Sequence, residues 1–384
     1  METVKGFRDI EASKKNKIKE IIEETFKLYN FQPVETPIIE YEKFVKGENT
    51  ADEVISDIFK LQDKGKRKLA LRYEFTFQYK RLAKNKKLPF KIYQIGPVFR
   101  DEPITGNRFR QFTQCDVDII GSDIKDEAEI LSLTKEILDK LGIDFVIYFN
   151  NRKLLNEILD EQKIKEKKAV IKEIDKLDKF PKKIVRENLK KYKAEKLLGI
   201  LNQNPEFFRK YESFSEIEWL IDYCELYRVE VKFAPFLARG LSYYNGTIFE
   251  IKTKGIKETV AGGGSYLVNG IQSTGISFGL DRLELLGKIE LDKSNVLVIS
   301  LNQDKKAIKL ADRIRKLKVP CSVMFGKPGR ALEYANSYNI SSVIFIGKEE
   351  VKKKKIKIRN MKTGKEKLVS EKLLLKSIKN INRL

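Results

Sequence analysis

Arginines and acidic residues are the side chains of this sequence best suited, by their chemistry and their positions along the chain, to catalysis or ligand binding. Arg100 and Glu102 stand before a short loop, Arg110 stands after it, and Arg239 and Arg282 follow further along the chain. Planar guanidinium groups keep their charge at any working pH and bind phosphate or carboxylate oxygens through paired hydrogen bonds. The chain has no histidine, which excludes Ser-His-Asp and Cys-His catalysis, an imidazole base and histidine-bearing metal sites. Its chemistry must therefore rely on arginines and carboxylates, with or without magnesium.

A nucleotide, if one binds, is not held by the common phosphate loops. The sequence contains no Gly-x-x-x-x-Gly-Lys-Ser/Thr segment, and the run Gly262-Gly-Gly264 lacks the spacing of a dinucleotide-binding loop. These residues also have ordinary structural interpretations, which stay open. A glycine run can form a tight turn or a bulge, and a single tyrosine usually packs in a core.

The sequence predicts that an antiparallel sheet with helices carries these residues. Short apolar and aromatic runs over residues 69–121, such as KIYQIGPVF and FTQCDVDIIG, predict antiparallel strands rather than repeated strand-helix-strand units. Helical spacing predicts helices over residues 11–30 and 123–141, and residues 31–40 read as an extended strand. Strand-like runs return at VEVKFAP, TIFEIKT and AGGGSY.

Two further regions differ from this pattern. Residues 151–215 are rich in lysine and glutamate with apolar positions every three or four residues, which predicts a small helical insertion. After residues 288–294, strand-like and helical runs alternate, which predicts a separate α/β domain. We therefore expect an α+β fold with a first domain over residues 1–290, which contains the insertion, and a second domain over residues 294–384.

The amino-acid composition limits the classes of binding partner and the cellular compartment that we expect for this protein. Lysine and arginine outnumber aspartate and glutamate by 77 to 55, a net charge of +22. This excess favours a polyanion as partner, and it leaves open RNA, DNA, an anionic membrane or simply a solvated lysine-rich surface. Cys115, Cys224 and Cys321 match neither a disulfide framework nor zinc-ligand spacing. Without an apolar run that could span a bilayer, the sequence predicts a cytoplasmic protein.

Several segments, in order, resemble the motifs of class II aminoacyl-tRNA synthetases. Thr36-Pro37 resembles motif 1, the FRDE and RFRQF segments around the loop after Arg100 resemble motif 2, and GLDRL with Arg282 resembles motif 3. The segments LARGLSYYNGTIFE (237–250) and AGGGSY (261–266) resemble the two signature sequences of histidyl-tRNA synthetases. The resemblance implies a class II catalytic domain with an antiparallel sheet and a helical insertion, followed by an α/β anticodon-binding domain.

The same resemblance implies an enzyme that activates histidine with ATP to histidyl-adenylate and transfers it to tRNA(His), working as a homodimer. Charge builds on a phosphorus centre between two anionic reactants in such a reaction, so fixed cations must balance it. Arg100 and Arg239 are the expected catalytic residues. Magnesium is expected to bridge the outgoing phosphates, with no dedicated metal motif in the sequence. The ATP-binding residues that the resemblance implies are Arg100, Glu102, Arg110, Phe112 and Arg282.

For the amino acid, the resemblance implies Glu74 and Thr76 near the α-ammonium group and Gln114 near the carboxylate end. Asp118 matches an acidic residue that accepts a hydrogen from the imidazole ring. A buried acceptor of this kind rejects substrates that lack the matching N–H by a factor on the order of ten thousand. The full set expected at histidine is Glu74, Thr76, Gln114, Asp118, Arg239, Tyr243, Tyr244 and Tyr266.

The chain also departs from the family pattern at five positions. They are Ser242 for Asp, Ser265 for Arg, Leu267 for Asp, Tyr73 for Pro and Phe75 for Gly. Because these positions flank the expected contact residues, we expect compensating partners for them.

Three alternatives stand beside this interpretation. The first is a non-catalytic paralogue, either a regulatory subunit of ATP phosphoribosyltransferase or a sensor of uncharged tRNA; such paralogues tend to lose the signature arginine and the anticodon-binding domain, and both are present here. The second is a synthetase for another amino acid, against which Asp118 argues. The third concerns only residues 352–359, whose lysines and arginine could line tRNA phosphates or could guard the edge strand of a sheet.

Overall fold

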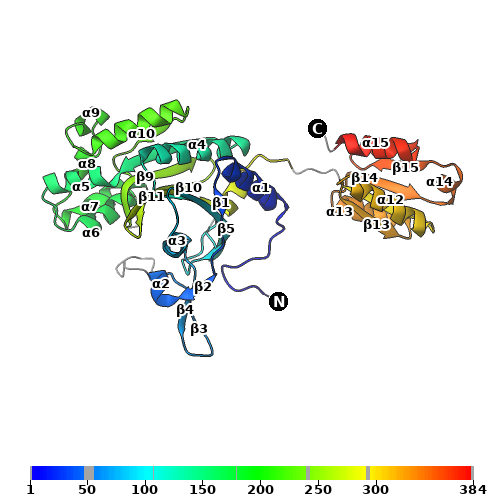
Figure 1. The fold of residues 1–384 in the computed structure, drawn as a ribbon, viewed down its shortest axis with the longest axis horizontal. Helices are drawn as coiled ribbons and strands as arrows, with labels where there is room; N and C mark the ends of the chain where they lie inside the picture. The colour runs from blue at the N-terminus through cyan, green and yellow to red at the C-terminus, as the bar shows by residue number, and fades with distance from the viewer. Residues whose placement is uncertain are drawn as a thin grey trace. The chain divides into compact units, whose positions relative to one another are not determined.

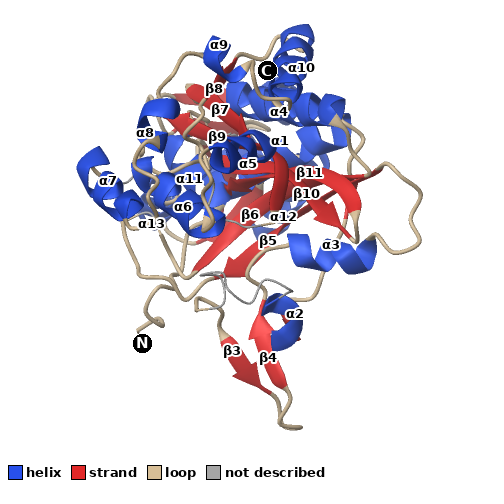
Figure 2. Ribbon diagram, turned by 90° about the vertical axis from the view of Figure 1, so that its left-hand side faces the viewer, coloured by secondary structure: helices blue, strands red, loops and turns tan. Residues whose placement is uncertain are grey.

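The first compact unit of the chain, Met1–Ile289, is built on an eight-stranded sheet (Figures 1 and 2). The computed structural model describes residues 2–46, 56–106, 108–178, 180–238, 243–290 and 295–381. Only the outer pairs β1/β5 and β7/β8 are parallel, and all inner pairs are antiparallel. The strands, in spatial order, are β1 (Gln32–Pro33), β5 (Phe90–Phe99), β6 (Gln111–Ile120), β11 (Ile271–Gly279), β10 (Ala261–Val268), β9 (Tyr244–Thr253), β7 (Phe145–Asn151) and β8 (Val231–Phe233).

Helices α1 (Ser13–Leu28), α4 (Ile124–Lys140) and α11 (Leu280–Leu286) cover one face of this sheet. Figures 1 and 2 both place α1 and α4 together on that side. The start of α4 is set by a capping box in which Asp123 and Asp126 satisfy each other's backbone N–H groups. The helices bury a continuous apolar core against the sheet, with members including Ile22, Phe26, Leu131, Phe249 and Phe278.

The region from residue 31 to 82 differs from the single strand and continuing sheet that the sequence suggested. The extended segment is split into β1 and β2 (Ile39–Tyr41), because Pro33 and Pro37 cannot donate to a ladder. A second, three-stranded sheet of order β2-β4-β3 follows. Its other members and the neighbouring helices are α2 (Glu42–Lys46), β3 (Lys60–Gln62), β4 (Lys68–Leu71) and α3 (Thr76–Leu82).

Helices occupy most of the chain between β7 and β8. Buried leucines and isoleucines on their inner faces join the core of the main sheet. This region holds α5 (Arg152–Glu161), α6 (Lys167–Ile174), a 3-10 helix (Asp175–Asp178), α7 (Lys182–Lys190), α8 (Leu197–Ile200), α9 (Pro205–Phe208) and α10 (Phe214–Leu226). None of the helices in the described part of the chain is long and apolar enough to cross a membrane.

The second compact unit, Glu290–Leu384, has its own five-stranded sheet and its own core. The sheet order is β13-β12-β14-β15-β16, with β12 parallel to both neighbours and β15 antiparallel to both of its own. Its elements are β12 (Val296–Ser300), α12 (Asp304–Lys316), β13 (Cys321–Phe325), α13 (Pro328–Ser337), β14 (Ser342–Ile346), α14 (Lys348–Lys352), β15 (Ile356–Asn360), β16 (Glu366–Val369) and α15 (Glu371–Ile381).

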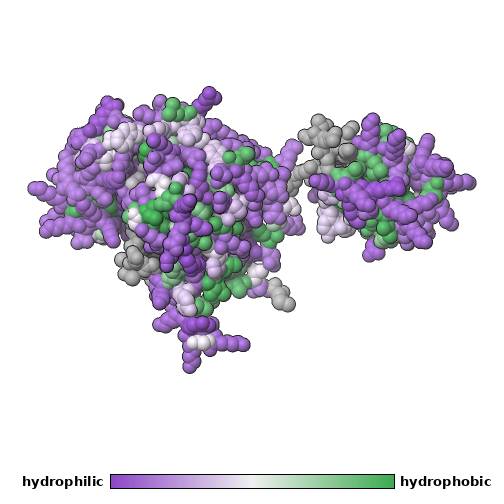
Figure 3. All heavy atoms as spheres, in the orientation of Figure 1, coloured by the Kyte–Doolittle hydropathy of each residue, from purple (hydrophilic) through white to green (hydrophobic). Residues whose placement is uncertain are grey.

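The lysine run of this second unit does not lie on an edge strand. Lys352 ends α14, and the next three lysines lead into β15, which is paired on both sides. Lys357 and Arg359 on β15 form ion pairs with Glu366. The interpretation of this run as protection of a sheet edge is therefore wrong, because β16 is the edge strand here. Figure 3 shows hydrophilic residues over most of the visible surface of each unit.

Candidate active site

Strand β6 presents three polar side chains on the sheet face opposite to α1 and α4. Successive residues of a strand point to opposite faces, so Cys115 and Val117 enter the helix-covered core while Gln114, Asp116 and Asp118 share the other face. All three polar residues are buried, with exposed fractions of 4–7%. Three buried polar groups in a row on one strand are uncommon outside functional sites.

Asp118 occupies a space that a glycine leaves open. It pairs with Gly275 on β11, and a Cβ atom at that glycine would lie 1.9 Å from Asp118 Oδ1. The hydroxyl of Tyr266 on β10 donates to Asp118 Oδ1 at 2.5 Å. Burial raises the pKa of Asp118 to about 7, the Tyr266 hydrogen bond opposes this rise, and the charge of Glu74 adds to it. Asp118 is thus a buried acceptor that can gain or lose a proton near neutral pH.

The glycine run in β10 belongs to a strand and not to a tight turn. It pairs with β9 and β11 on both sides, with a register shift between Gly264 and Tyr266. At Gly263 a Cβ atom would lie 2.0 Å from the carbonyl oxygen of Gly275. Gly264, with a φ of +152°, allows the irregularity that turns Tyr266 toward Asp118.

Asp116 makes a contact that the sequence did not indicate. Ser277 Oγ on β11 donates to Asp116 Oδ1 at 2.5 Å and accepts from Gln114 Nε2 at 2.5 Å. Burial raises the pKa of Asp116 well above its usual value, the charge of Asp118 adds to this rise, and the Ser277 hydrogen bond opposes it. Neither Asp116 nor Ser277 belongs to the set of residues predicted from the sequence.

A tyrosine cluster lies next to these carboxylates. The ring centres of Tyr243 and Tyr244 are 4.8 Å apart, and those of Tyr243 and Tyr266 are 5.7 Å apart. The Tyr243 hydroxyl donates to Glu74 Oε2 at 3.4 Å. Burial and the charge of Glu74 raise the pKa of Tyr243 well above its usual value. Thr76, at the start of α3, lies close enough to Tyr243 to lower that pKa through a hydrogen bond. The structure therefore brings together the described residues predicted for histidine.

Arg100, at the end of β5, is held between two aromatic rings. Its guanidinium carbon lies 4.2 Å from the ring centre of Tyr73 and 5.1 Å from that of Phe112. Its Nε donates to the Tyr73 carbonyl oxygen at 3.4 Å, and its Nη1 lies 3.8 Å from Glu102 Oε1. These contacts orient the guanidinium group, whose remaining N–H donors can bind an anion.

A cluster of positive charge surrounds Glu102. Arg108 Nη1 lies 3.9 Å from Glu102 Oε2. Arg282 Nη1 donates to the Thr259 carbonyl oxygen at 2.5 Å, and burial followed by the charge of Arg108 lowers the pKa of Arg282. Arg100 also contributes to that lowering, so these arginines repel one another, as in a site built for a polyanion. Arg108 has no role in the predicted set, although it lies in the segment that suggested the site.

Arg110 is placed differently from its neighbours. Its Nη2 lies 2.9 Å from Asp101 Oδ1, and its backbone N–H donates to the carbonyl oxygen of Gly6. Arg239, the second expected catalytic residue, and Ser242 lie outside the described residues. Among the described residues no group of three or more Cys, Asp or Glu side chains could hold a metal ion. Mg²⁺ at nucleotide sites takes most of its ligands from phosphates and water and needs only one or two carboxylates from the protein.

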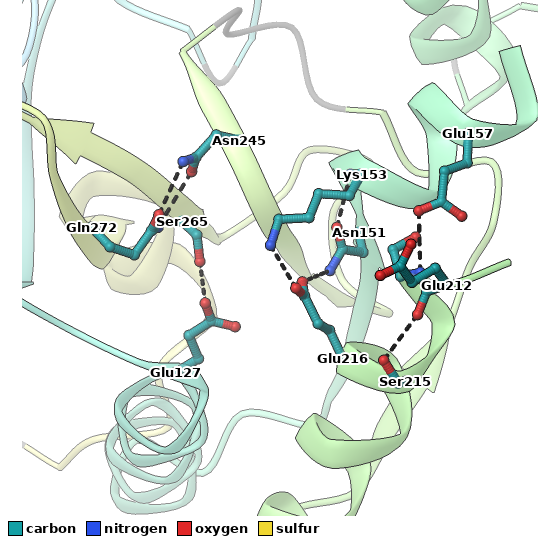
Figure 4. A network of polar contacts seen from close by, with 11 residues as sticks. Glu127, Asn151, Lys153, Glu157, Glu212, Ser215, Glu216, Asn245, Ser265 and Gln272 are labelled. Atoms are coloured by element: carbon teal, nitrogen blue, oxygen red, sulfur yellow. Dashed lines mark hydrogen bonds and ion pairs between the residues drawn. The ribbon is translucent and has the colours of Figure 1, made fainter. Parts of the chain in front are cut away.

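Three of the four described departures from the family pattern have partners, and the fourth, Leu267, is an exposed side chain. Ser265 on β10 donates a hydrogen bond to Glu127 on α4 (Figure 4), which lies on the helix-covered face of the sheet. Burial raises the pKa of Glu127 to about 7, and the Ser265 hydrogen bond opposes this rise. Tyr73 stacks on Arg100 as described, Phe75 is buried beneath the Arg72 guanidinium group at 4.7 Å, and Leu267 is 47% exposed.

Comparisons with known proteins identify the family of this chain. The family model described as histidyl-tRNA synthetase matches residues 6–283, and the model described as anticodon binding domain matches residues 295–381. "Histidine--tRNA ligase 1" of Bacillus cereus is 35% identical, covering 95% of this chain and 94% of that protein. "Histidine--tRNA ligase" of Wolinella succinogenes is 34% identical, covering 95% of each.

Solved structures show the same fold. A histidyl-tRNA synthetase from Nostoc sp. PCC 7120 superposes with a TM-score of 0.85 at 24% identity, covering 100% of this chain and 99% of that one. A protein from Bacillus halodurans C, titled as an ATP phosphoribosyltransferase regulatory subunit/histidyl-tRNA synthetase, gives a TM-score of 0.76 at 22% identity, covering 90% of this chain and 97% of that one. With the match of the family model over most of the sequence, this chain belongs to the histidyl-tRNA synthetase family.

Proposed function

We propose that this chain is a histidine–tRNA ligase, which joins histidine to ATP as histidyl-adenylate and transfers the histidyl group to tRNA(His). The observation that carries the proposal is the buried Asp118 carboxylate, held by Tyr266, on the same strand face as Gln114. A buried acceptor with one fixed donor can take a second donor from a ligand. The imidazole N–H of histidine has the chemistry to fill that place.

The part of the site that would bind the α-ammonium group is negatively charged, in contrast to the arginine cluster. Glu74, near Tyr243 and Thr76, offers a carboxylate for the α-ammonium group. The packed tyrosine rings of residues 243, 244 and 266 would line the side-chain pocket and exclude water from it. Selection then depends on buried polar groups that only histidine satisfies, because a ligand without the matching N–H leaves them unpaired.

The arginine cluster would bind ATP. Arg100, fixed between Tyr73 and Phe112, is suited to the α-phosphate oxygens on which charge builds during transfer. Arg239 shares this role in the proposal, on the strength of the signature segment alone. Arg282 and Arg108 would bind the outer phosphates, which Mg²⁺ would bridge, and Glu102 would accept from the adenine amino group. Arg110 would support the loop through Asp101.

The other partners follow from the two domains. We assign the catalytic role to residues 1–290, with a helical insertion at about 151–215, and tRNA anticodon binding to residues 294–384, which the anticodon-binding model supports. The net charge of +22 suits a nucleic acid partner. A homodimer and a cytoplasmic location complete the proposal; the unpaired thiols of Cys115, Cys224 and Cys321 fit a reducing compartment.

Histidine-dependent exchange of pyrophosphate into ATP tests the proposal directly. Purified protein should catalyse exchange with histidine and not with the other amino acids. Transfer of labelled histidine to tRNA(His) should follow in the same preparation. Folded protein that binds tRNA but supports no exchange would instead be a non-catalytic paralogue, and the proposal would be wrong.

A further inference from the structure

Asp116 is a buried carboxylate to which none of the proposed substrate contacts gives a role. It lies between Gln114 and Asp118 on the same face of β6 and is 4% exposed. Ser277 on the neighbouring strand β11 connects it to Gln114, since the serine hydroxyl contacts both side chains at 2.5 Å. Gln114, Ser277 and Asp116 thus form one chain of hydrogen bonds that crosses from β6 to β11 and back.

The direction of donation in this chain orients the Gln114 amide. A serine hydroxyl has one hydrogen, and Ser277 gives it to Asp116 Oδ1 when that carboxyl is ionised. Burial raises the pKa of Asp116, and a cation bound nearby would oppose that rise and favour this ionised form. The Ser277 oxygen can then only accept, so the nitrogen end of the Gln114 amide must face it, as Nε2 does. The oxygen end, Oε1, is consequently turned away from Ser277. If the hydroxyl were free to rotate, it could donate to Gln114 and the amide could turn over.

The amide oxygen of Gln114 is an open acceptor. Gln114 is 7% exposed, and its Oε1 has no hydrogen-bond partner within the described residues. A buried acceptor left without a donor destabilises the protein, so a ligand that donates an N–H at this point would be bound favourably.

The charges around Gln114 indicate which group of a ligand would donate to its Oε1. Asp116 and Asp118 share the face of β6 with Gln114, and Glu74 is linked to Asp118 through the packed rings of Tyr243 and Tyr266, whose hydroxyls donate to these two carboxylates. The three carboxyl groups repel one another when ionised, which adds to the rise that burial causes in the pKa of Asp116, and a bound cation would relieve that repulsion. A cation is attracted to such a cluster and an anion is repelled. Of the two ends of an amino acid, only the α-ammonium group has both a positive charge and N–H donors.

On the basis of the proposed function, we infer that Asp116 and Ser277 are positioning residues that hold the Gln114 oxygen toward the α-ammonium group of the amino acid. They act through Gln114 and do not touch the substrate themselves. This role differs from the expectation that Gln114 serves the carboxylate end.

Ser277→Ala breaks the chain of hydrogen bonds with the smallest change of volume. Ser277→Thr keeps the hydroxyl and is the rescue variant. Ser273→Ala is the matched control, because it removes a hydroxyl of the same strand whose hydrogen bond within the described part of the chain goes to the Ile271 carbonyl oxygen. For each variant, pyrophosphate exchange gives KM for histidine and for ATP. Two inhibitors separate the ends of the substrate: histamine lacks the carboxylate, and 3-(imidazol-4-yl)propionate lacks the amine.

Ser277→Ala should raise KM for histidine and the inhibition constant of histamine by about tenfold, the effect of one hydrogen bond. The KM for ATP and the inhibition constant of imidazolylpropionate should stay within about twofold of their wild-type values, a much smaller change than the tenfold rise expected for histidine and histamine. Asp116→Ala should act in the same direction. The double variant should be no worse than the more impaired single variant, because both changes break one chain. Ser277→Thr should restore wild-type values, and Ser273→Ala should leave them unchanged.

Two results would overturn the inference without touching the proposed function. One is an active Ser277→Ala enzyme with an unchanged KM for histidine. The other is an equal weakening of histamine and imidazolylpropionate, which would mean a general disturbance of the pocket. Absence of histidine-dependent exchange in the wild-type protein would instead overturn the proposed function and the inference with it.

Discussion

Tyr266→Phe should make histidine binding depend more steeply on pH than it does in the wild-type protein. The substitution removes one hydroxyl group, which donates to Asp118 Oδ1 at 2.5 Å, and it keeps the ring that packs against Tyr243. In the proposed function Asp118 accepts from the imidazole N–H of histidine, and an ionised carboxylate is the better acceptor. The Tyr266 hydrogen bond favours the ionised form, since it opposes the rise of the Asp118 pKa that burial causes.

The size of the effect follows from the pKa of Asp118. That pKa is about 7 in the wild-type protein, so about half of the molecules carry the charge at pH 7. A hydrogen bond to a charged group contributes about 1.5–3 kcal/mol, and one pKa unit corresponds to about 1.4 kcal/mol. Losing the bond should raise the pKa by about one unit or more, which leaves about a tenth of the molecules ionised at pH 7.

The assay is KM for histidine in pyrophosphate exchange at pH 7 and at about pH 8.5. Tyr266→Phe should raise KM about fivefold or more at pH 7, and for a one-unit shift KM should return to within about twofold of wild type at the higher pH. Tyr93→Phe is the control, because it removes a tyrosine hydroxyl that donates to Glu23 on α1, outside the pocket. The same ratio of variant to wild-type KM at both pH values would refute the reasoning.

Three further predictions concern the rate, the stability and the core. Arg239→Ala should lower the rate of adenylate formation by about a hundredfold with little change in substrate KM; an unchanged single-turnover rate would remove it from the mechanism. The pKa of Glu127, about 7 in the fold against a usual 4.5, means that the free energy of unfolding falls as pH rises from about 4.5 through 7. Glu127→Gln should make that fall smaller in urea titrations, and an identical pH profile would contradict this. Phe249→Ala, at a fully buried position, should lower the free energy of unfolding by about 3–5 kcal/mol; a loss below about 1 kcal/mol would mean that the core refills the cavity.

Local sequence patterns predicted the regular elements well where one face is apolar. The helical spacing over residues 11–30 and 123–141 corresponds to α1 and α4, which bury most of their apolar side chains against the sheet, whereas Leu28 at the end of α1 is exposed. The alternating runs around Arg100 correspond to the hairpin of β5 and β6. Helix α3 was missed because it is short and follows an irregular segment, so too few turns exist to establish a period.

Pairings between distant strands could not be read from the sequence. Strand β6 pairs with β11, and the helical region lies between them in the chain. Alternation tells which residues share a face, but it does not tell which strand lies alongside. The contact of Ser277 with Asp116 depends on that pairing, which is why neither residue was predicted. The clearance that Gly275 leaves for Asp118 depends on it too.

The sequence alone establishes which side-chain chemistry the protein can use and which family it belongs to. It has no histidine, so the site must use arginines and carboxylates, and the order of its motifs is that of the histidyl-tRNA synthetases. The tertiary structure alone decided which of these groups are buried, which share a hydrogen bond and which way each one donates. Those properties depend on desolvation and on contacts between strands far apart in the chain, and they set the pKa of Asp118 near neutrality.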